Sequence, residues 1–175
     1  MSLKEKEKLL VVVDMQGDFI GGALGTEQAR AILPAVRRRV ARARAEGERI
    51  VFTRDTHGEE YLATNEGKNL PVPHCLRGSA GWQIAEGLGA AGDTVFDKPA
   101  FGSVALGEYA AAEGFSQIEL IGVCTDICVI SNALLLKAFL PDAEICVRAD
   151  CCAGVTPESH ERALGAMAAC QVKII

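Results

Sequence analysis

The sequence predicts an α/β protein with a doubly wound, mostly parallel six-stranded sheet that carries helices on both faces. Short apolar runs that read as buried strands alternate along the chain with longer segments of helical spacing. Strands and helices that alternate in this way form parallel sheets covered on both sides. The 175 residues, 49% of them hydrophobic, suffice for one sizeable core. We therefore expect a single domain over residues 1–175.

Six apolar runs read as strands because each is short and is bounded by charged or turn-forming residues. They span residues 9–13, 49–53, 94–97, 117–123, 144–149 and 172–175. The run 9–13 is continuously apolar, which is typical of a strand buried on both faces of a parallel sheet.

Four segments with helical spacing separate these runs. They span residues 27–46, 106–113, 126–140 and 157–169. Gly47 and Gly114 end the first two helices, as glycine commonly does, and Pro141 stops the third. The fourth opens with Thr156 as N-cap and Pro157 at the first helical position.

Composition argues against several classes of function. The net charge is −5, and the arginines at positions 37, 38, 39, 42 and 44 fall in one helical segment. We interpret them as a solvated helix face rather than a nucleic-acid site. No apolar run approaches the roughly 18 residues of a membrane span, and residues 1–8 lack the apolar region of a signal peptide. Seven cysteines without a disulfide-like spacing indicate a reducing, cytoplasmic location.

Three ionisable residues stand at or just beyond the ends of apolar runs: Asp14, Lys98 and Cys128. Because ligands of an open α/β sheet bind at the carboxyl ends of its strands, we expect these side chains to converge. A carboxylate can take a thiol proton, a lysine can stabilise both charges, and a thiolate can attack an electrophilic carbon. Singly, Asp14 could cap a turn, Lys98 could lie on the surface and Cys128 could fill the core. Their joint placement favours catalysis.

Cys128 lies where the strand 117–123 gives way to a helical segment. Unpaired N–H groups and the macrodipole at a helix N-terminus favour negative charge. We therefore expect the thiol of Cys128 to be more acidic than a free cysteine. The same N–H groups could receive a developing oxyanion.

Residues 56–81 form a long irregular stretch rich in Gly, Pro and Asn, and loops of this length are usually functional. Asp55 and His57 begin it, and Glu66 and His74 follow. These four side chains could supply nitrogen and oxygen ligands to a divalent ion, although an ordinary loop remains the alternative. His160, in contrast, lies beside Glu161 in a helical segment and is interpreted as a solvated residue.

Three elements together resemble the isochorismatase-like cysteine hydrolases. They are the start VVDMQGDF around Asp14, the strand end at Lys98, and the segment GVCTDICV around Cys128. The resemblance covers nearly the whole chain. It implies a Rossmann-like fold, a catalytic triad of these three residues, and an oxyanion hole formed by the backbone N–H groups of Cys124 and Cys128. It also implies a cis peptide bond between Val123 and Cys124.

Within this family, the residues TRDTH around Asp55 and His57 and PHCLRG around His74 resemble the nicotinamidases, which hydrolyse nicotinamide to nicotinate and ammonia. The resemblance implies a divalent ion, often zinc, bound by these three residues, with Glu66 as a further ligand in some members. Iron or manganese would also suit such ligands. Phe19 is a candidate wall for the small-molecule amide, with a core role as the alternative.

The chain also departs from the nicotinamidase pattern. Pro71 stands where an aromatic residue is usual, and the second histidine after the Asp-x-His motif is missing, with Tyr61 nearby. Residues 99–103 differ from the usual aromatic pattern as well, so the wall that stacks on the substrate can differ. Because members of the family commonly form dimers or tetramers, the resemblance implies a homo-oligomer.

Three functions therefore stay open. The first is a metal-assisted nicotinamidase-type amidase that works through a thioester. The second is a cysteine hydrolase of another small amide, a ureide or isochorismate. The third is a non-enzymatic redox or metal-binding module that uses Cys124, Cys128, Cys151 and Cys152. Ammonia release from nicotinamide separates the first from the other two.

Overall fold

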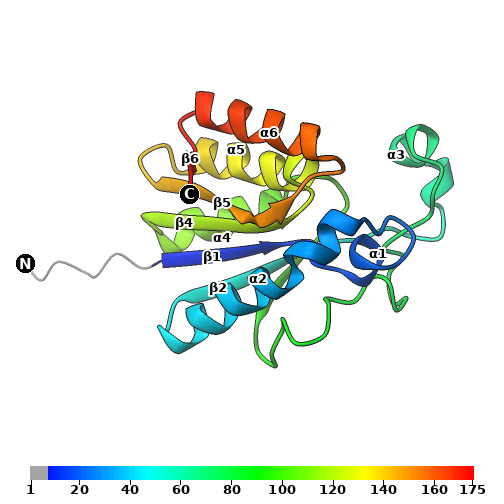
Figure 1. The fold of residues 1–175 in the computed structure, drawn as a ribbon, viewed down its shortest axis with the longest axis horizontal. Coiled ribbons are helices and arrows are strands. Elements are labelled where there is room, and N and C mark those ends of the chain that lie inside the picture. Colours follow the sequence, from blue (N-terminus) through cyan, green and yellow to red (C-terminus); the bar gives the residue numbers. More distant parts are fainter. Residues whose placement is uncertain (1–7) are drawn as a thin grey trace, which may run out of the picture.

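The computed structural model describes residues 8–175 and confirms a six-stranded sheet in which all strands are parallel (Figure 1). The strands are β1 (Lys8–Val13), β2 (Arg49–Asp55), β3 (Thr94–Lys98), β4 (Gln117–Val123), β5 (Glu144–Ala153) and β6 (Lys173–Ile174). Their order is β3-β2-β1-β4-β5-β6. The direction of winding reverses between β1 and β4, and ligands bind at such a switch point. The charged N-terminal segment weighed as a signal peptide lies outside the described residues, apart from Lys8.

Helices cover both faces of the sheet, as predicted (Figure 1). They are α2 (Glu27–Ala45) on one face and α4 (Val104–Glu113), α5 (Ile130–Phe139) and α6 (Pro157–Ala169) on the other. Strand β1 divides its side chains between them, because successive residues of a strand point to opposite faces. Leu9, Val11 and Val13 pack with α4, α5 and α6. Leu10 and Val12 pack with α2.

The helix ends confirm the local signals read from the sequence. Thr156 caps α6 and forms a reciprocal pair with Ser159, and Pro157 occupies the first turn. Gly114 ends α4 with a φ of 72°, a left-handed conformation that glycine adopts without penalty. No helix among residues 8–175 is both long and apolar enough to cross a membrane.

Several elements differ from the sequence prediction. The helix expected over 126–140 begins as a π-helical turn, η2 (Thr125–Val129), and becomes α-helical only in α5. Strand β5 runs to Ala153, past its predicted end, because its register with β4 shifts between Leu120 and Gly122 and the added residues of β5 pair with Gly122 and Val123.

Short helices also interrupt the predicted loops: α1 (Gly17–Ile20), η1 (Tyr61–Ala63) and α3 (Asn65–Asn69). These segments are too short to carry a periodic apolar pattern, so sequence alone does not reveal them. All three lie beyond the carboxyl ends of β1 and β2, and α1 and α3 can be seen there in Figure 1.

The arginine-rich face of α2 is only partly solvated. Arg37, Arg38, Arg42 and Arg44 are exposed, as predicted. The prediction is wrong for Arg39, which is half-buried and forms ion pairs with Glu48 and Glu119.

Candidate active site and metal-binding group

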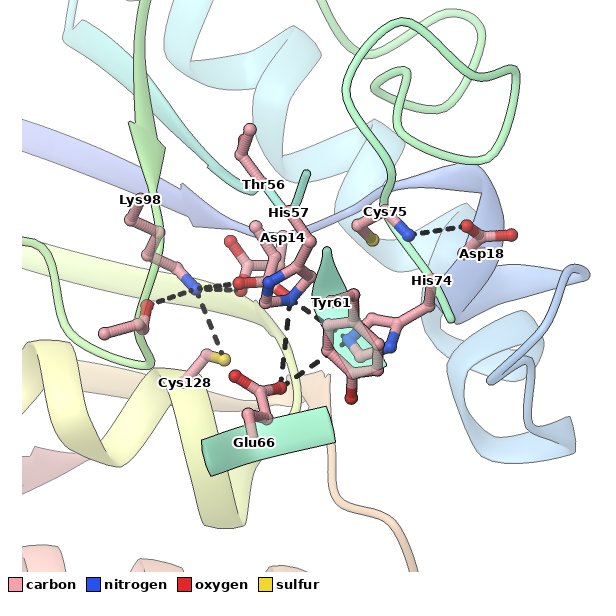
Figure 2. Close-up of polar contacts among 12 residues, drawn as sticks. Asp14, Asp18, Thr56, His57, Tyr61, Glu66, His74, Cys75, Lys98 and Cys128 are labelled. Carbon is pink, nitrogen blue, oxygen red and sulfur yellow. Dashed lines mark hydrogen bonds and ion pairs between the residues drawn. The ribbon is translucent and has the colours of Figure 1, made fainter. Parts of the chain in front are cut away.

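The carboxyl ends of β1 and β3 and the turn after β4 bring Asp14, Lys98 and Cys128 together, as expected. Figure 2 shows the three side chains pointing toward one another. The Lys98 Nζ lies 2.7 Å from Asp14 Oδ2 and 3.5 Å from Cys128 Sγ. The side chains of Asp14, Lys98 and Cys128 are all buried. The alternative of a surface lysine is therefore wrong.

The backbone around Asp14 directs its carboxylate into this cluster. Asp14 has a φ of 48°, a left-handed conformation that Asp tolerates better than most residues. Its N–H donates to the Thr53 carbonyl at 3.2 Å, and the Thr53 hydroxyl donates to Asp14 Oδ1 at 2.7 Å. Oδ2 accepts no other hydrogen bond and faces the lysine. One oxygen is thus anchored and the other is available as a base.

Gly122 allows the end of β4 to approach β1 at this point. A Cβ atom at position 122 would lie 2.1 Å from the carbonyl oxygen of Val13, and the φ of Gly122 is 118°. Only glycine fits this close approach. The turn that carries Cys124 and Cys128, called the cysteine turn below, therefore starts directly beside β1, the strand that leads to Asp14.

The charges of the cluster set its resting protonation. Burial lowers the pKa of the Lys98 ammonium, but the Asp14 carboxylate above all, together with the neighbouring Cys128 and Asp55, outweighs it and holds this pKa well above its usual value. Burial raises the pKa of the Asp14 carboxyl, and Lys98 offsets this effect only in part. Lys98 is therefore cationic, and Asp14 is a stronger base than a solvated carboxylate.

The acidity predicted for Cys128 is wrong for the free protein. Burial raises the pKa of this thiol well above its usual value, and the neighbouring Asp14 carboxylate raises it further. Lys98 lowers it, but not by enough. Desolvation of a buried thiolate outweighs the field of a helix end, so the resting sulfur is a neutral thiol.

A second group lies next to this cluster and comprises Asp55, His57, Glu66 and His74. One potential ligand atom from each lies within 4.8 Å of all the others. His57 Nε2 lies 2.9 Å and His74 Nε2 3.3 Å from Asp55 Oδ2. Glu66, carried by α3, points toward both imidazoles (Figure 2), with Oε1 at 3.8 and 3.7 Å from their Nε2 atoms.

These separations fit a bound metal ion. Four ligands at about 2.0–2.2 Å around a tetrahedral zinc ion lie roughly 3.3–3.6 Å from one another. His74 Nδ1 lies 2.8 Å from the Val72 carbonyl, which can only accept, so Nδ1 carries a proton and Nε2 is the nitrogen whose lone pair would bind a metal ion once Nε2 is deprotonated. The four predicted ligands are therefore brought together in a form that suits a divalent cation.

Contacts outside this group hold its members in place. The Tyr61 ring packs edge-on against both imidazoles, with centroids at 4.8 Å from His57 and 5.1 Å from His74. Next to His74, the N–H of Cys75 donates to Asp18 Oδ2 at 2.8 Å (Figure 2). Tyr61 thus packs directly against two of the four potential ligands.

Gln16 fixes the backbone of Asp55 and was not identified from the sequence. Its Oε1 accepts the Asp55 N–H at 2.7 Å, and its Nε2 donates to the Asp55 carbonyl at 2.9 Å. Burial raises the pKa of the Asp55 carboxyl, but hydrogen bonds from His57 and His74 and the charge of Lys98 outweigh it and hold this pKa below its usual range. Asp55 therefore stays ionised.

Lys98 joins the two groups, because its Nζ also lies 3.4 Å from Asp55 Oδ1. A cavity of about 960 Å³ opens above them and is lined by Cys128 and by all four potential metal ligands. Phe19 also lines it and stacks edge-on against His74 with centroids 5.7 Å apart. Phe19 also packs into the core with residues of α2, as its alternative role required, and its role as a substrate wall stays a prediction.

The cysteine turn has features that sequence reasoning predicted and others that it missed. The Val123–Cys124 peptide is cis, as the resemblance implied. The Oγ1 of the buried Thr125 lies 2.8 Å from Nδ1 of His160, so the interpretation of His160 as a solvated residue is wrong.

Asn132 was also missed. This fully buried amide donates to the carbonyls of Cys128 at 2.8 Å and Phe101 at 3.1 Å, and accepts the N–H of Ser103 at 2.9 Å. It ties the nucleophile candidate to the loop after Lys98.

The cysteines do not form a redox or metal-binding group. All seven are free. Cys151 packs on the α2 side of the sheet and Cys152 on the other side, because neighbouring residues of a strand point to opposite faces. This arrangement contradicts the module considered as the third function.

Comparisons with known proteins identify similar sequences and structures. The nicotinamidase/pyrazinamidase of Mycobacterium tuberculosis is 26% identical over 185 residues, which cover 96% of this chain and 98% of that protein. The crystal structure of the pyrazinamidase of Pyrococcus horikoshii in complex with zinc matches with a TM-score of 0.84 and 30% identity, over 97% of this chain and 98% of that one.

A third similar structure is that of N-carbamoylsarcosine amidase from Thermoplasma acidophilum. It matches with a TM-score of 0.79 and 25% identity, over 96% of this chain and 95% of that one. A family model, the Isochorismatase domain, matches residues 8–175. The chain therefore belongs to the isochorismatase family.

Proposed function

We propose that this protein is a cysteine-dependent amidase that hydrolyses nicotinamide to nicotinate and ammonia, with a divalent metal ion, zinc in the first instance, positioning the substrate. The observation that carries the proposal is that Lys98 contacts both Cys128 and Asp55. A nucleophile candidate and a metal-ligand candidate thereby face one cavity.

In the proposed reaction, Oδ2 of Asp14 accepts the proton of Cys128 as the sulfur forms a bond to the amide carbon. Lys98 remains cationic and offsets the negative charge that moves between carboxylate and sulfur. The backbone N–H groups of Cys124 and Cys128 receive the oxyanion. Asp14 returns the proton to the leaving nitrogen, ammonia departs, and a thioester remains. Water then hydrolyses the thioester and regenerates the thiol.

Asp55, His57, Glu66 and His74 would hold the ion, and Phe19 would form one wall for the ring. An ion bound there would supply a Lewis-acidic site for a ring nitrogen. Two imidazoles and two carboxylates suit zinc, and the same donors accept iron or manganese. The ligand separations of 2.9–3.8 Å support this assignment.

A different small amide is the second candidate, and the similarity to an N-carbamoylsarcosine amidase favours considering it. The cavity lining argues against substrates that carry a carboxylate. None of the lining residues in the described part of the chain is lysine or arginine, while Asp55 and Glu66 contribute negative charge. An anionic substrate such as isochorismate would thus find no lysine or arginine side chain in the lining to pair with.

The test is ammonia release from nicotinamide, pyrazinamide and a panel of aliphatic amides and ureides, with and without a chelator. We expect turnover of the pyridine and pyrazine amides and its loss on chelation. The variant Cys128→Ala should lose turnover but keep its melting temperature, and Cys170→Ala, at an exposed cysteine, should retain both. Activity retained in Cys128→Ala would refute the nucleophile, and activity restricted to other amides would favour the second candidate.

We further propose a cytoplasmic protein and a homo-oligomer. Seven free cysteines support the first proposal, because reducing compartments keep thiols unpaired. The proposal of a homo-oligomer rests on the dimers and tetramers that members of the family commonly form, and sedimentation analysis tests it.

A further inference from the structure

The cavity is much larger than nicotinamide requires. An enclosed space of about 150 Å³ holds a benzene ring in proteins, whereas this cavity measures about 960 Å³. That volume lies at the upper end of the range of roughly 300–1,000 Å³ found for drug-sized ligands. A pyridine amide held between the thiol and the metal ligands would leave most of the space unfilled.

The outer part of the cavity is apolar and half-exposed. Leu70, Phe101 and Val155 line it and are 38%, 45% and 46% exposed. Leu70 follows α3, Phe101 follows β3, and Val155 lies between β5 and α6, so three separate segments place a large apolar side chain at one mouth. We call these three residues the apolar rim. Apolar side chains that gather in this way around a cavity mark a surface that a ligand covers.

Besides the apolar rim, the lining contains the uncharged polar residues Thr26, Thr64, Asn65 and Asn69, and its charged members Asp55 and Glu66 are acidic. Lys98 is buried, does not line the cavity, and contacts Asp14, Asp55 and the Cys128 thiol. A group that reaches the apolar rim would therefore bind best without a charge, because a carboxylate against these side chains would find no lysine or arginine among the lining residues.

Given the amidase function proposed above, on which this inference rests, we propose that the substrate is an uncharged aromatic carboxamide with an apolar extension that lies against the rim. The carboxamide reaches Cys128 and the ring lies beside Phe19 and the metal ligands. The extension covers Leu70, Phe101 and Val155, and its burial adds affinity in proportion to the apolar area removed from water.

The test compares nicotinamide with 5-phenylnicotinamide and with nicotinamide that carries a 5-carboxylate. A group at this ring position crowds neither the ring nitrogen nor the carboxamide. We expect kcat/KM for the phenyl compound to exceed that for nicotinamide by at least about tenfold, mainly through KM, since burial of one aromatic ring gains that much or more. The carboxylate compound should fall below nicotinamide.

Binding to Cys128→Ala, measured by calorimetry, gives a readout that does not depend on turnover. The phenyl compound should bind at least about tenfold more tightly than nicotinamide. Phe101→Ala and Val155→Ser should reduce this preference several-fold. Leu134→Ala, an equally exposed apolar residue on α5 outside the cavity lining, should leave it unchanged.

The outcomes separate the two proposals. Hydrolysis of nicotinamide with no preference for the phenyl compound would overturn the apolar subsite and leave the amidase intact. Absence of ammonia from every amide would overturn the amidase, while the calorimetry would still decide the subsite. Rim variants that change the sedimentation of the protein but not the preference would identify the rim as a subunit interface, and this result would also overturn the proposal.

Discussion

The ammonium of Lys98 lies 2.7 Å from Oδ2 of Asp14, and both side chains are almost completely buried. Such a buried ion pair does not make the fold more stable than an apolar alternative would. Two apolar side chains would fill the same space without the desolvation free energy that the two charges cost. Removal of one partner, however, strongly lowers the free energy of unfolding, because the other partner is then a buried charge without a counter-charge. The pair is retained, we infer, because the reaction uses both groups.

The variant Lys98→Met keeps the length of the side chain and removes its charge. We expect it to lose ammonia release and to lower the free energy of unfolding by about 3–5 kcal/mol, as measured by urea denaturation at neutral pH. Lys137→Met is the matched control, because this lysine on α5 makes only an exposed hydrogen bond to the Pro141 carbonyl. Its effect should stay within about 0.5 kcal/mol. Equal stability of the two variants would contradict the role given to the buried pair.

Asn132 connects two parts of the proposed active site that are separate in sequence. Its side-chain amide bonds to the carbonyl of Cys128 and to the backbone of Phe101 and Ser103, and the Asn132 side chain is fully buried. The variant Asn132→Asp has almost the same shape but cannot donate to the two carbonyls. Because buried groups left without partners cost about 1–3 kcal/mol each, we expect a loss of about 3 kcal/mol in urea denaturation.

The same variant should also lower kcat more than it raises KM, because it displaces the sulfur rather than the substrate pocket. Zinc binding is the internal control, since Asn132 contacts none of the four proposed ligands, and it should be unchanged. A variant with native kcat would show that the position of Cys128 does not depend on this amide.

Sequence reasoning located the residues that end strands. Asp14 and Lys98 could be predicted because each stands at the end of a strand-like run, and the doubly wound sheet could be predicted because strands and helices alternate. The four potential metal ligands were predicted from residue type, and from a family resemblance, within a loop too long to be a simple connection. In each case the signal was local in sequence, and only the convergence in space required the fold.

The residues that support the site could not be predicted in the same way. Thr53 and Gln16 bond to groups 39 residues away, and Thr125 bonds to His160 across 35 residues. Polar residues of these types usually lie on the surface, so nothing in the local pattern marks them as buried. The pKa of Cys128 was mispredicted for a related reason, because burial depends on the packed fold and not on the position of a residue in a helix.

Glu66 provides a separate test of the metal group, because it lies on the short helix α3 and only some members of the family are expected to use it. Replacement of its carboxylate by an amide in Glu66→Gln removes a negative ligand with little change in shape. We expect the zinc dissociation constant, measured by competition with a chromogenic chelator, to rise at least about tenfold.

Glu59→Gln is the matched control for Glu66, since Glu59 is exposed on the same loop and belongs to no ligand group. Its zinc affinity should equal that of the unmodified protein. Unchanged affinity in both variants would restrict the ligands to Asp55, His57 and His74.

A second charged cluster lies at the opposite end of the sheet and predicts how stability depends on pH. The carboxylate of Glu119 accepts hydrogen bonds from Arg39 at 2.9 and 3.0 Å and from Arg148 at 2.7 Å. Burial raises the pKa of Glu119, but the two guanidinium groups outweigh it and hold this pKa below its usual value of 4.5. The folded state therefore binds a proton at Glu119 less readily than the unfolded chain.

The stabilisation from Glu119 is complete above the unfolded pKa and is lost as the pH falls through the lower folded pKa. The unmodified protein should lose part of its free energy of unfolding as the pH is lowered from about 5 to about 3. Glu119→Gln should start from a lower stability at neutral pH and lose less over this interval, since it has no carboxylate to protonate. Glu144→Gln, which removes a largely exposed ion pair of 3.8 Å with Lys173, should follow the unmodified protein. Urea denaturation at each pH measures the difference, and parallel curves for all three proteins would show that Glu119 is not a source of acid lability.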